Sequence, residues 1–381
     1  LMGKGASIFL CFAVAALITV GLVMLASASA KWDTNDEQYF YLTRQARWLV
    51  VGMVGLGLIA FMDYRFLKKG APYFFGIAVL ALIGCYIPGI GDAAKGESRW
   101  IVLPLLGRFQ PSEPAKLVVM IALAAWFAKH QAETKTLIKG FITPGLILGI
   151  PLLLILFEKD MGTAVGLGAA GLMVLFIAGT RIWYLAPTIA AGAVGFVLMV
   201  QNSPNRMERW KAFLEPEKYR EGAGWQQAMA LEAFGNGGPS GVGLGNGIVK
   251  QMNFPEHHTD FIFPVIGEEL GLIVTLGIVF CFVVIFLVGV GISLHASDLF
   301  GRILGLGVTG IIVVPAMMNI GVTTSMIPNT GLPLPFVSYG GSNLVFTLAM
   351  VGVLLSILRR SVIVDGREIP AVKEKKVELR L

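Results

Sequence analysis

The chain alternates between long apolar stretches and shorter polar connections, and this alternation is its dominant pattern. About 20 helical residues suffice to cross a hydrocarbon layer of ~30 Å, and most of the apolar stretches reach that length. Backbone in lipid must satisfy its own hydrogen bonds, so helices are expected. The pattern predicts about ten of them, at roughly 6–29, 47–62, 71–88, 115–129, 141–157, 162–180, 183–201, 265–294, 302–326 and 343–358.

Basic residues fall in alternate short connections, and this predicts how the spans are oriented. Positive connections stay on the cytoplasmic side, and the residues concerned are Lys4, Arg65, Lys68, Lys69, Lys129, Lys135, Lys139, Arg181, Arg302, Arg359 and Arg360. The connections expected to face outward are 30–46, 89–114, 201–264 and 327–342. An even number of spans puts both termini in the cytoplasm. The prediction is a polytopic domain over 1–358 followed by a basic cytoplasmic tail over 359–381.

The composition supports lipid as the solvent. The chain is 55% hydrophobic and only 14% charged, more apolar than an ordinary soluble core requires. The first apolar stretch lacks a small-residue cleavage site and is expected to be a retained span. The formal net charge of +6 is concentrated in inner connections and the tail, so topology and anionic lipid explain it without nucleic acid. Cys11, Cys85 and Cys281 show no paired spacing, which indicates neither a disulfide framework nor a metal knuckle.

The outer connection before the fourth span collects charged residues. Arg99 is followed by Glu113 and Lys116, which lead directly into the span. Ser112 is expected to cap that helix. Glu113 and Lys116 are three residues apart and share a helix face, so the simpler interpretation is a self-neutralising pair. The functional interpretation is that Lys116, an ionisable group at the start of a span, serves a polar cavity.

Asp160 lies in a very short connection between two spans, and two interpretations stay open. In one, the connection is a polar outer turn, with Gly162 and Gly166 allowing close helix packing. In the other, Asp160 turns inward and neutralises Lys116 or Arg99 at the mouth of a cavity.

The connection 201–264 is the longest polar interruption of the chain. It opens with basic and aromatic residues around Arg206 and Arg209, a pattern typical of a helix at the membrane interface. A glycine-rich run over 235–247 fits no nucleotide motif and predicts turns with close backbone approach, with amide donors available to a diphosphate.

Asp260 closes this connection, immediately before the next apolar run. A carboxylate where water gives way to hydrocarbon is expected to have a raised pKa unless a cation is near, and this is how a general base is tuned. His257 and His258 are consecutive and lack a spaced third ligand, so a transition-metal site is not indicated. Of Glu268 and Glu269, two turns further on, one is expected to face the bundle interior.

The outward connection 327–342 is too rich in proline and glycine for a helix and too apolar for a free loop. Such backbone is tolerated at membrane depth only when it is buried in protein or lines a cavity. We expect a re-entrant or capping hairpin over the outer cavity, and it contains Ser338.

Five blocks of sequence together resemble the SEDS family (shape, elongation, division and sporulation), which includes RodA and FtsW. They follow the family's order and span nearly the whole membrane region: Gly96-Glu-Ser-Arg-Trp100 with Phe109-Gln-Pro-Ser-Glu-Pro-Ala-Lys116, Glu158-Lys-Asp-Met-Gly-Thr163, Pro255-Glu-His-His-Thr-Asp-Phe-Ile-Phe263, Gly267-Glu-Glu-Leu-Gly271, and Gly331-Leu-Pro-Leu-Pro-Phe-Val-Ser-Tyr-Gly-Gly-Ser342. Pro114 stands where the family usually has an apolar residue, and Glu158-Lys-Asp replaces a more common pattern with proline. The segment 243–250 is more similar to the division members.

The resemblance implies an all-α bundle of ten transmembrane helices that polymerises lipid II on the outer face of the plasma membrane, alongside a class B penicillin-binding protein. It implies that Asp260 is the essential aspartate, and that the polar cavity residues are Arg99, Glu113, Lys116 and Asp160.

The expected reaction needs a carboxylate that acts as a base and cations that stabilise the leaving group. Asp260 removes a proton from the attacking sugar hydroxyl, while positive groups stabilise the leaving diphosphate. The candidate cations are Arg99 and Lys116, helped by Arg206 and Arg209, and the remaining candidate substrate contacts are Glu113, Asp160, His258 and Ser338. No cofactor is required by the sequence, which leaves room for a divalent cation (Mg²⁺ or Mn²⁺) at the diphosphate.

Two rival functions remain open at this point. A transporter that flips lipid II would also need a polar cavity, but transporters often contain internal repeats and the sequence shows no duplicated block. A noncatalytic scaffold for the crosslinking enzyme would not depend on Asp260.

Overall fold

A computed structural model describes residues 2–29, 39–89, 91–92, 99–103, 107–251 and 258–365, and within them it contains twelve α-helices and one small sheet. Ten of these helices correspond to the predicted spans: α1 (Met2–Ser29), α2 (Phe40–Phe61), α3 (Arg65–Gly84), α4 (Ser112–Lys129), α5 (Thr143–Phe157), α6 (Met161–Ile177), α7 (Ile182–Gln201), α10 (Ile262–Leu294), α11 (Leu299–Thr323) and α12 (Gly341–Asp365). The other two, α8 (Pro204–Leu214) and α9 (Trp225–Gly237), belong to the long connection.

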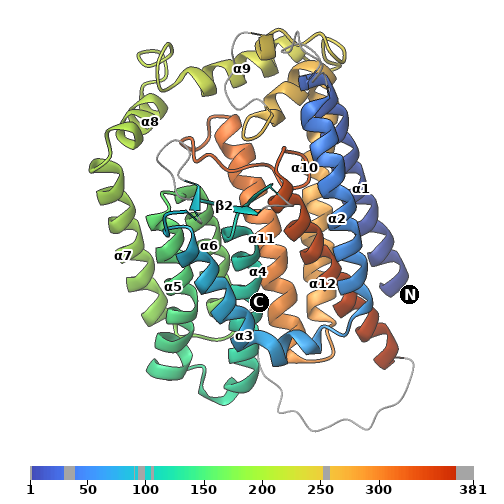
Figure 1. Cartoon of the computed structure of the whole chain (residues 1–381), viewed down its shortest axis with the longest axis vertical. Coiled ribbons are helices and arrows are strands. Elements are labelled where there is room, and N and C mark those ends of the chain that lie inside the picture. The colour runs from blue at the N-terminus through green and yellow to red at the C-terminus, as the bar shows by residue number, and fades with distance from the viewer. Residues whose placement is uncertain are drawn as a thin grey trace.

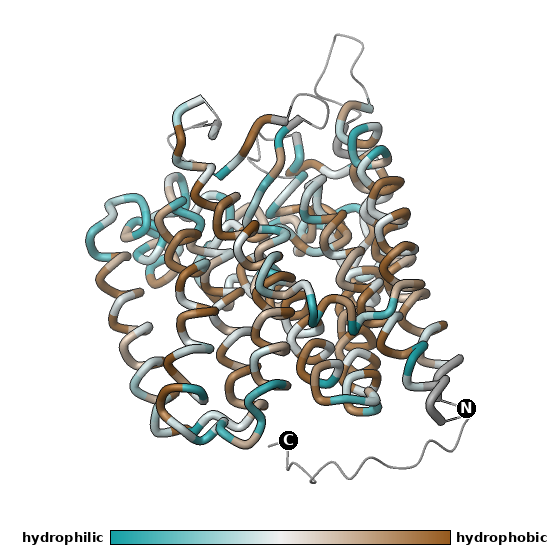
Figure 2. The backbone as a smooth tube through the Cα atoms, turned by 60° about the horizontal axis from the view of Figure 1, so that its bottom comes forward, coloured by the Kyte–Doolittle hydropathy of each residue, from teal (hydrophilic) through white to brown (hydrophobic). Residues whose placement is uncertain are grey.

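Most of the long helices have the length and composition of membrane spans. Eight of them qualify among the described residues. The other two are shorter or more charged, since α6 has 17 residues and α4 contains Glu113, Lys116 and Lys129. Figure 2 shows the apolar positions running along the helices and the polar ones gathered near their ends. The predicted fold class, an all-α multi-span membrane protein, is confirmed.

α11 lies at the centre of the bundle and packs against α10, α4, α6 and α12. Its glycines allow this close packing. A Cβ at Gly305 would lie 2.4 Å from Ser293 Oγ on α10, and a Cβ at Gly307 would lie 2.9 Å from Met120 Sδ on α4. Small residues at helix interfaces let backbones approach closely in a bundle that lipid surrounds. By contrast, α7 is largely exposed and lies at one edge of the bundle (Figure 1).

Several predicted boundaries were wrong. α2 begins at Phe40 rather than at residue 47, and its extra turns include Arg44, whose guanidinium lies over the Phe40 ring. α3 begins at Arg65 and ends at Gly84, earlier at both ends than predicted. α12 continues to Asp365, so the first residues of the predicted tail are helical. Hydropathy locates the apolar centre of a helix, but helices continue past it into water.

A three-stranded antiparallel sheet precedes α4, and the sequence analysis did not predict it. It consists of β1 (Gly91–Asp92), β2 (Trp100–Leu103) and β3 (Gly107–Phe109), with β2 in the middle. Strands this short carry too few residues for an alternating pattern to be recognised. The sheet lies at the same end of the bundle as α8 and α9, while α1 begins and α12 ends at the other (Figure 1).

α10 is broken near its start. Gly271 has φ +79° and ψ −179°, which is not helical, and such a φ favours glycine because it has no Cβ. The break separates a short half-helix, residues 262–270, from the long helix that follows. Asp260 lies just before this half-helix.

Candidate functional site

The segment 329–343, which includes most of the α11–α12 connection and the first residues of α12, contacts each of the three places where the sequence predicted functional carboxylates. A Cβ at Gly162, two residues after Asp160, would lie 2.7 Å from Thr330 O. Further along, Ser342 Oγ accepts a hydrogen bond from Gln110 N (3.2 Å). Asn343 Nδ2 donates to Glu113 Oε2 (3.2 Å). The α11–α12 connection and the first turn of α12 together therefore contact the α5–α6 turn and the start of α4.

Three consecutive backbone carbonyls fix the chain at Asp260. His258 O accepts from Tyr339 N (2.9 Å), Thr259 O accepts from Ser338 Oγ (2.6 Å), and Asp260 O accepts from Asn319 Nδ2 (2.7 Å). The donors come from α11 and from the segment 329–343. Asp260 is thus held in place by elements distant from it in the sequence.

The carboxylate of Asp260 faces Gly331. A Cβ at Gly331 would lie 3.4 Å from Asp260 Oδ2, and Gly331 has φ +67°. Its amide donates to Asn329 Oδ1 (3.1 Å), and Asn329 Nδ2 donates to Gln226 Oε1 on α9 (2.8 Å). Glycine here allows the turn to pass close to the carboxylate.

Glu113 and Lys116 form a buried ion pair, as the simpler interpretation predicted. Lys116 Nζ lies 2.9 Å from both Glu113 Oε1 and Oε2, and the two residues are 6% and 3% exposed. The predicted cap was wrong. Ser112 is the first residue of α4, Pro111 occupies the cap position, and no side-chain cap bond is formed.

Asp160 caps α6. Its Oδ1 accepts from Thr163 N (3.0 Å) and its Oδ2 from Thr163 Oγ1 (2.9 Å). Gln110 Nε2 also donates to Oδ2 (3.2 Å). Of the two cations proposed for Asp160, Lys116 pairs instead with Glu113 within the described residues, from one helical turn away. That Asp160 neutralises Arg99 stays a prediction. Gly162 packs closely, as the other interpretation predicted, but against residues 330 and 332.

Arg99 lies against the α5–α6 turn. Its Nη2 donates to Lys159 O (2.7 Å) and its Nε to Glu158 O (3.4 Å). Beside it, burial raises the pKa of Glu158 to about 8; the Asp160 carboxylate acts in the same direction, and the Cys85 thiol and Arg99 oppose them. Arg99 therefore lies next to two carboxylates with different surroundings, one capping a helix and one buried.

Arg206 and Arg209 both lie on α8, which packs against α7. Arg209 lines an open cavity of about 320 Å³ together with Trp225 and Gln226. Gln226 is the residue that bonds Asn329. Arg209 thus shares a cavity with a residue of α9 that bonds to the segment facing Asp260, whereas Arg206 is not among the residues that line this cavity.

The side chains of His258 and Ser338 make contacts within the protein. The His258 ring stacks on Tyr41, with centroids 4.2 Å apart and planes 23° apart. Ser338 is buried, and its hydroxyl donates to Thr259 O while accepting from Leu334 N (2.7 Å). In this structure Ser338 braces the residue before Asp260. His257 lies outside the described residues.

The glycine-rich run makes the close backbone approach that the sequence predicted, but its amides do not point to a ligand. Val242 N and Gly243 N donate to the carbonyls of Glu268 and Glu269. Gly245 N donates to the Glu269 carboxylate (2.8 Å). For these three amides the expectation of a diphosphate site was wrong, because they donate to Glu268 and Glu269 on α10. Both glutamates are buried, where only one was expected to face inward.

Sequence reasoning missed the uncharged residues that organise the site. Asn319 donates to both Asp260 O and Leu332 O, and Gln110 and Asn343 fix Asp160 and Glu113. A buried amide side chain must be hydrogen-bonded, so an asparagine inside an apolar span such as α11 was the available signal.

Long apolar helices and buried ionisable groups near one end of the bundle define a multi-span membrane protein with a polar site at one membrane face. The family model described as "Cell cycle protein", which covers FtsW, RodA and SpoVE, matches residues 8–362, and the chain belongs to this family.

Individual relatives agree with this assignment. The chain is 38% identical over 347 residues to a probable peptidoglycan glycosyltransferase FtsW of Geobacter sp. (strain M18), covering 90% of this chain and 94% of that one. Among solved structures, it is similar to a chain of a peptidoglycan synthase complex that coordinates polymerization and crosslinking, with 27% identity, a TM-score of 0.76, and coverage of 92% and 97%. It is also similar to Thermus thermophilus rod shape determining protein RodA, with 26% identity, a TM-score of 0.67, and coverage of 92% and 95%.

Proposed function

We propose that the protein polymerises lipid II into glycan strands at the outer face of the bacterial plasma membrane, with Asp260 as the general base. The protein is a peptidoglycan glycosyltransferase of its family. The observation that supports the role of Asp260 is the fixed backbone of residues 258–260, held by three donors from two other segments. A general base must be held within hydrogen-bond reach of the proton it removes.

The reaction joins a sugar hydroxyl of one lipid-linked disaccharide to the anomeric carbon of another. Asp260 accepts the hydroxyl proton as the new carbon–oxygen bond forms. The bond between the anomeric carbon and the diphosphate breaks, and negative charge grows on the departing oxygen. The site must therefore supply a proton acceptor on one side and positive charge on the other.

Lys116 and Arg99 are the proposed counter-charges for the diphosphate. A lysine ammonium carries three donors, and the two contacts with Glu113 use at most two of them. Arg99 is anchored by the carbonyls of the α5–α6 turn, and a guanidinium suits phosphate oxygens. Glu113 and Asp160 keep the empty site close to neutral. Arg209, through its cavity with Gln226, is the third proposed cation.

The proposed partner is a class B penicillin-binding protein. This rests on the similarity to a chain of a peptidoglycan synthase complex that coordinates polymerization and crosslinking. Co-purification of the two membrane proteins from one expression host tests the association.

A divalent cation at the diphosphate is tested separately. The polymerisation rate is compared in the presence of Mg²⁺, Mn²⁺ and a chelator.

Asp260→Asn tests the proposed function directly. The change is almost isosteric but removes the proton acceptor, so strand synthesis from lipid II by purified protein should fall by ~10²–10⁴-fold. The measurement is gel analysis of glycan strands, with the melting temperature as a check on folding. Glu215→Gln, which neutralises an exposed carboxylate on the α8–α9 connection, is the control and should retain normal activity.

Near-normal polymerisation by Asp260→Asn would refute the role of Asp260 as the base. Liposomes that contain the protein separate the rival functions. Transfer of lipid II between leaflets without any strand product would support a transporter. Partner binding without either activity would support a scaffold.

A further inference from the structure

The half-helix that begins α10 is not aligned by the rest of α10. Gly271 interrupts the helix, and the regular bond from residue 272 to residue 268 is replaced. Leu272 N instead donates to Gly238 O (3.0 Å), and Glu268 O accepts from Val242 N (2.9 Å). The backbone of the glycine-rich run thus completes the hydrogen bonds that the break leaves open.

The same half-helix carries Asp260 before its first residue and Glu268 and Glu269 near its last. Its nine residues span about 13 Å at 1.5 Å per residue. Because the break uncouples it from the long helix, its direction depends on what holds its two ends. The Asp260 end is held by the three carbonyl contacts described above.

The other end is held by a group of four residues that we call the clasp: Ser27, Gly245, Lys250 and Glu269. Lys250 Nζ lies 2.5 Å from Glu269 Oε1 and donates to Ser27 Oγ (2.8 Å). Ser27 Oγ donates to Glu269 Oε2 (2.6 Å), which also accepts from Gly245 N (2.8 Å). The clasp therefore ties the end of α1, the loop before α10 and the half-helix together.

The clasp is buried, so its geometry is tightly defined. The side chains of Lys250 and Glu269 are 3% and 0% exposed. The neighbouring Glu268 reinforces the same junction, because its carboxylate accepts from the amides of Ile248 and Val249 (3.0 and 3.1 Å). Charges buried this deeply are costly unless they are paired and hydrogen-bonded.

We propose that the clasp positions Asp260 for reaction by fixing the direction of the half-helix. Lys250, Glu269 and Ser27 are positioning residues that act through the backbone of residues 260–270. This inference rests on the proposed role of Asp260 as the base. It predicts that loosening the clasp slows the chemical step while substrate binding and folding persist.

A purely structural ion pair makes a different prediction, and this difference allows a test. Removing one partner of a buried pair strongly destabilises a protein, but replacing both with apolar residues of similar size is often neutral. If the pair serves stability alone, Lys250→Met/Glu269→Leu should be as active as the parent. If it positions Asp260, the double variant should fold but react slowly.

The experiment measures kcat and KM for lipid II polymerisation, together with the melting temperature, for the full-length double variant. We expect kcat to fall on the order of 10²-fold, the effect of misplacing a catalytic group by about 1 Å, with KM unchanged. A loss of kcat without a change in KM marks an interaction that matters in the transition state. Parental kcat in the folded double variant overturns the proposal.

Ser27→Ala gives an independent result if the double variant does not fold. It removes the hydroxyl between Lys250 and Glu269 but keeps the ion pair, so kcat should fall by about tenfold, and an unchanged kcat again overturns the proposal. Asp260→Asn, measured in parallel, separates the two levels of inference. If it is inactive while the clasp variants are fully active, the base assignment stands and the positioning role is lost. If Asp260→Asn is active, the proposed function itself fails.

Discussion

Glu158 and Asp160 are two residues apart in one turn, yet their surroundings differ. Asp160 accepts hydrogen bonds from Thr163 and Gln110. Glu158 is only 1% exposed, and burial, with help from Asp160, raises its pKa to about 8. A carboxyl group with a raised pKa binds its proton more tightly in the folded state than in the unfolded state.

The pKa of Glu158 predicts how stability depends on pH. Its contribution to folding is fully present below the ordinary glutamate pKa and is lost as pH rises through about 8. Glu158→Gln, which is neutral at every pH, should therefore gain melting temperature relative to the parent as pH rises from about 4.5 to about 8. Thermal melts in detergent across this range provide the measurement. A constant difference between the two proteins would show that Glu158 is not protonated when folded.

At the residue scale, short-range contacts were predictable and long-range ones were not. The pair Glu113–Lys116 followed from a spacing of three on one helix face. The partner of Asp160 did not, because Gln110 reaches it from a segment 50 residues away. The sequence marked Asp260 as reactive, but Asn319, Tyr339 and Ser338, which hold it, became apparent only in the folded chain.

Among the elements, α10 shows why one apolar run can contain two helices. The run over 265–294 was predicted as one uninterrupted span, and the break at Gly271 was missed. A single glycine is common in membrane helices. What makes this one a break is the loop over 238–243, which supplies the alternative hydrogen bonds.

Gly271→Ala should disrupt the break. A Cβ there would lie 2.4 Å from Gly241 N, and the φ of +79° is unfavourable for alanine, so we expect a loss of more than about 1 kcal/mol in unfolding free energy. Gly277→Ala is the matched control on the same helix, because nothing lies within 4 Å of its Cβ position. Denaturation of both variants measures the difference. Equal stability of the two variants would mean that the loop over 238–243 shifts to accommodate the methyl group without loss of unfolding free energy.

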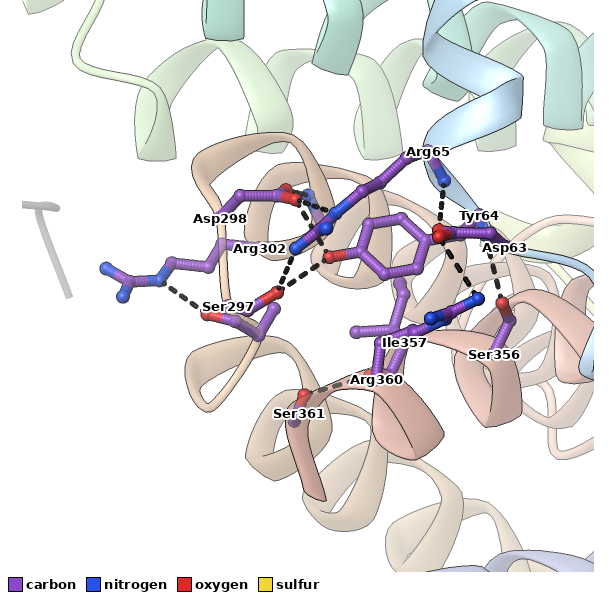
Figure 3. Close-up of polar contacts among 12 residues, drawn as sticks. Asp63, Tyr64, Arg65, Ser297, Asp298, Arg302, Ser356, Ile357, Arg360 and Ser361 are labelled. Carbon is purple, nitrogen blue, oxygen red and sulfur yellow. Dashed lines mark hydrogen bonds and ion pairs between the residues drawn. The ribbon is translucent and has the colours of Figure 1, made fainter. Parts of the chain in front are cut away.

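On the scale of the whole molecule, a second polar network (Figure 3) lies at the end of the bundle opposite α8 and α9 (Figure 1). Tyr64 is fully buried, and its hydroxyl donates to Asp298 Oδ2 (3.0 Å) and lies 3.2 Å from Ser297 Oγ. Its backbone amide donates to Ser356 Oγ (3.1 Å). Arg65 Nε also pairs with Asp298 Oδ2 (3.0 Å). The network joins the α2–α3 turn, the α10–α11 turn and α12.

Tyr64→Phe separates this network from the site. The change removes one buried hydroxyl and leaves Asp298 with one donor fewer, which should cost about 1 kcal/mol of stability. Because the network lies away from Asp260, kcat and KM of the folded variant should match those of the parent. Melting temperature and polymerisation rate, measured on the same preparation, provide the test. A selective loss of kcat would reveal coupling between the two ends of the bundle.

The sequence by itself determined which stretches become helices in the membrane, because the cost of placing a side chain in lipid depends mainly on that side chain and adds along the chain. It also identified the blocks of charged residues that the family resemblance connects to catalysis. These conclusions depend on local composition or on neighbours along one helix. They required no knowledge of which helix packs against which.

Only the tertiary structure decided which residues bond to each buried charged group. Ser27 and Glu269 are 242 residues apart in the sequence, and Asn319 reaches Asp260 across 59 residues. A buried charge takes whichever partner the packed helices bring within hydrogen-bond distance, and many partners have the right chemistry in a chain this long. The chain therefore specifies its spans locally, whereas the surroundings of Asp260 arise from the packing of α1, α10, α11 and the segment 329–343.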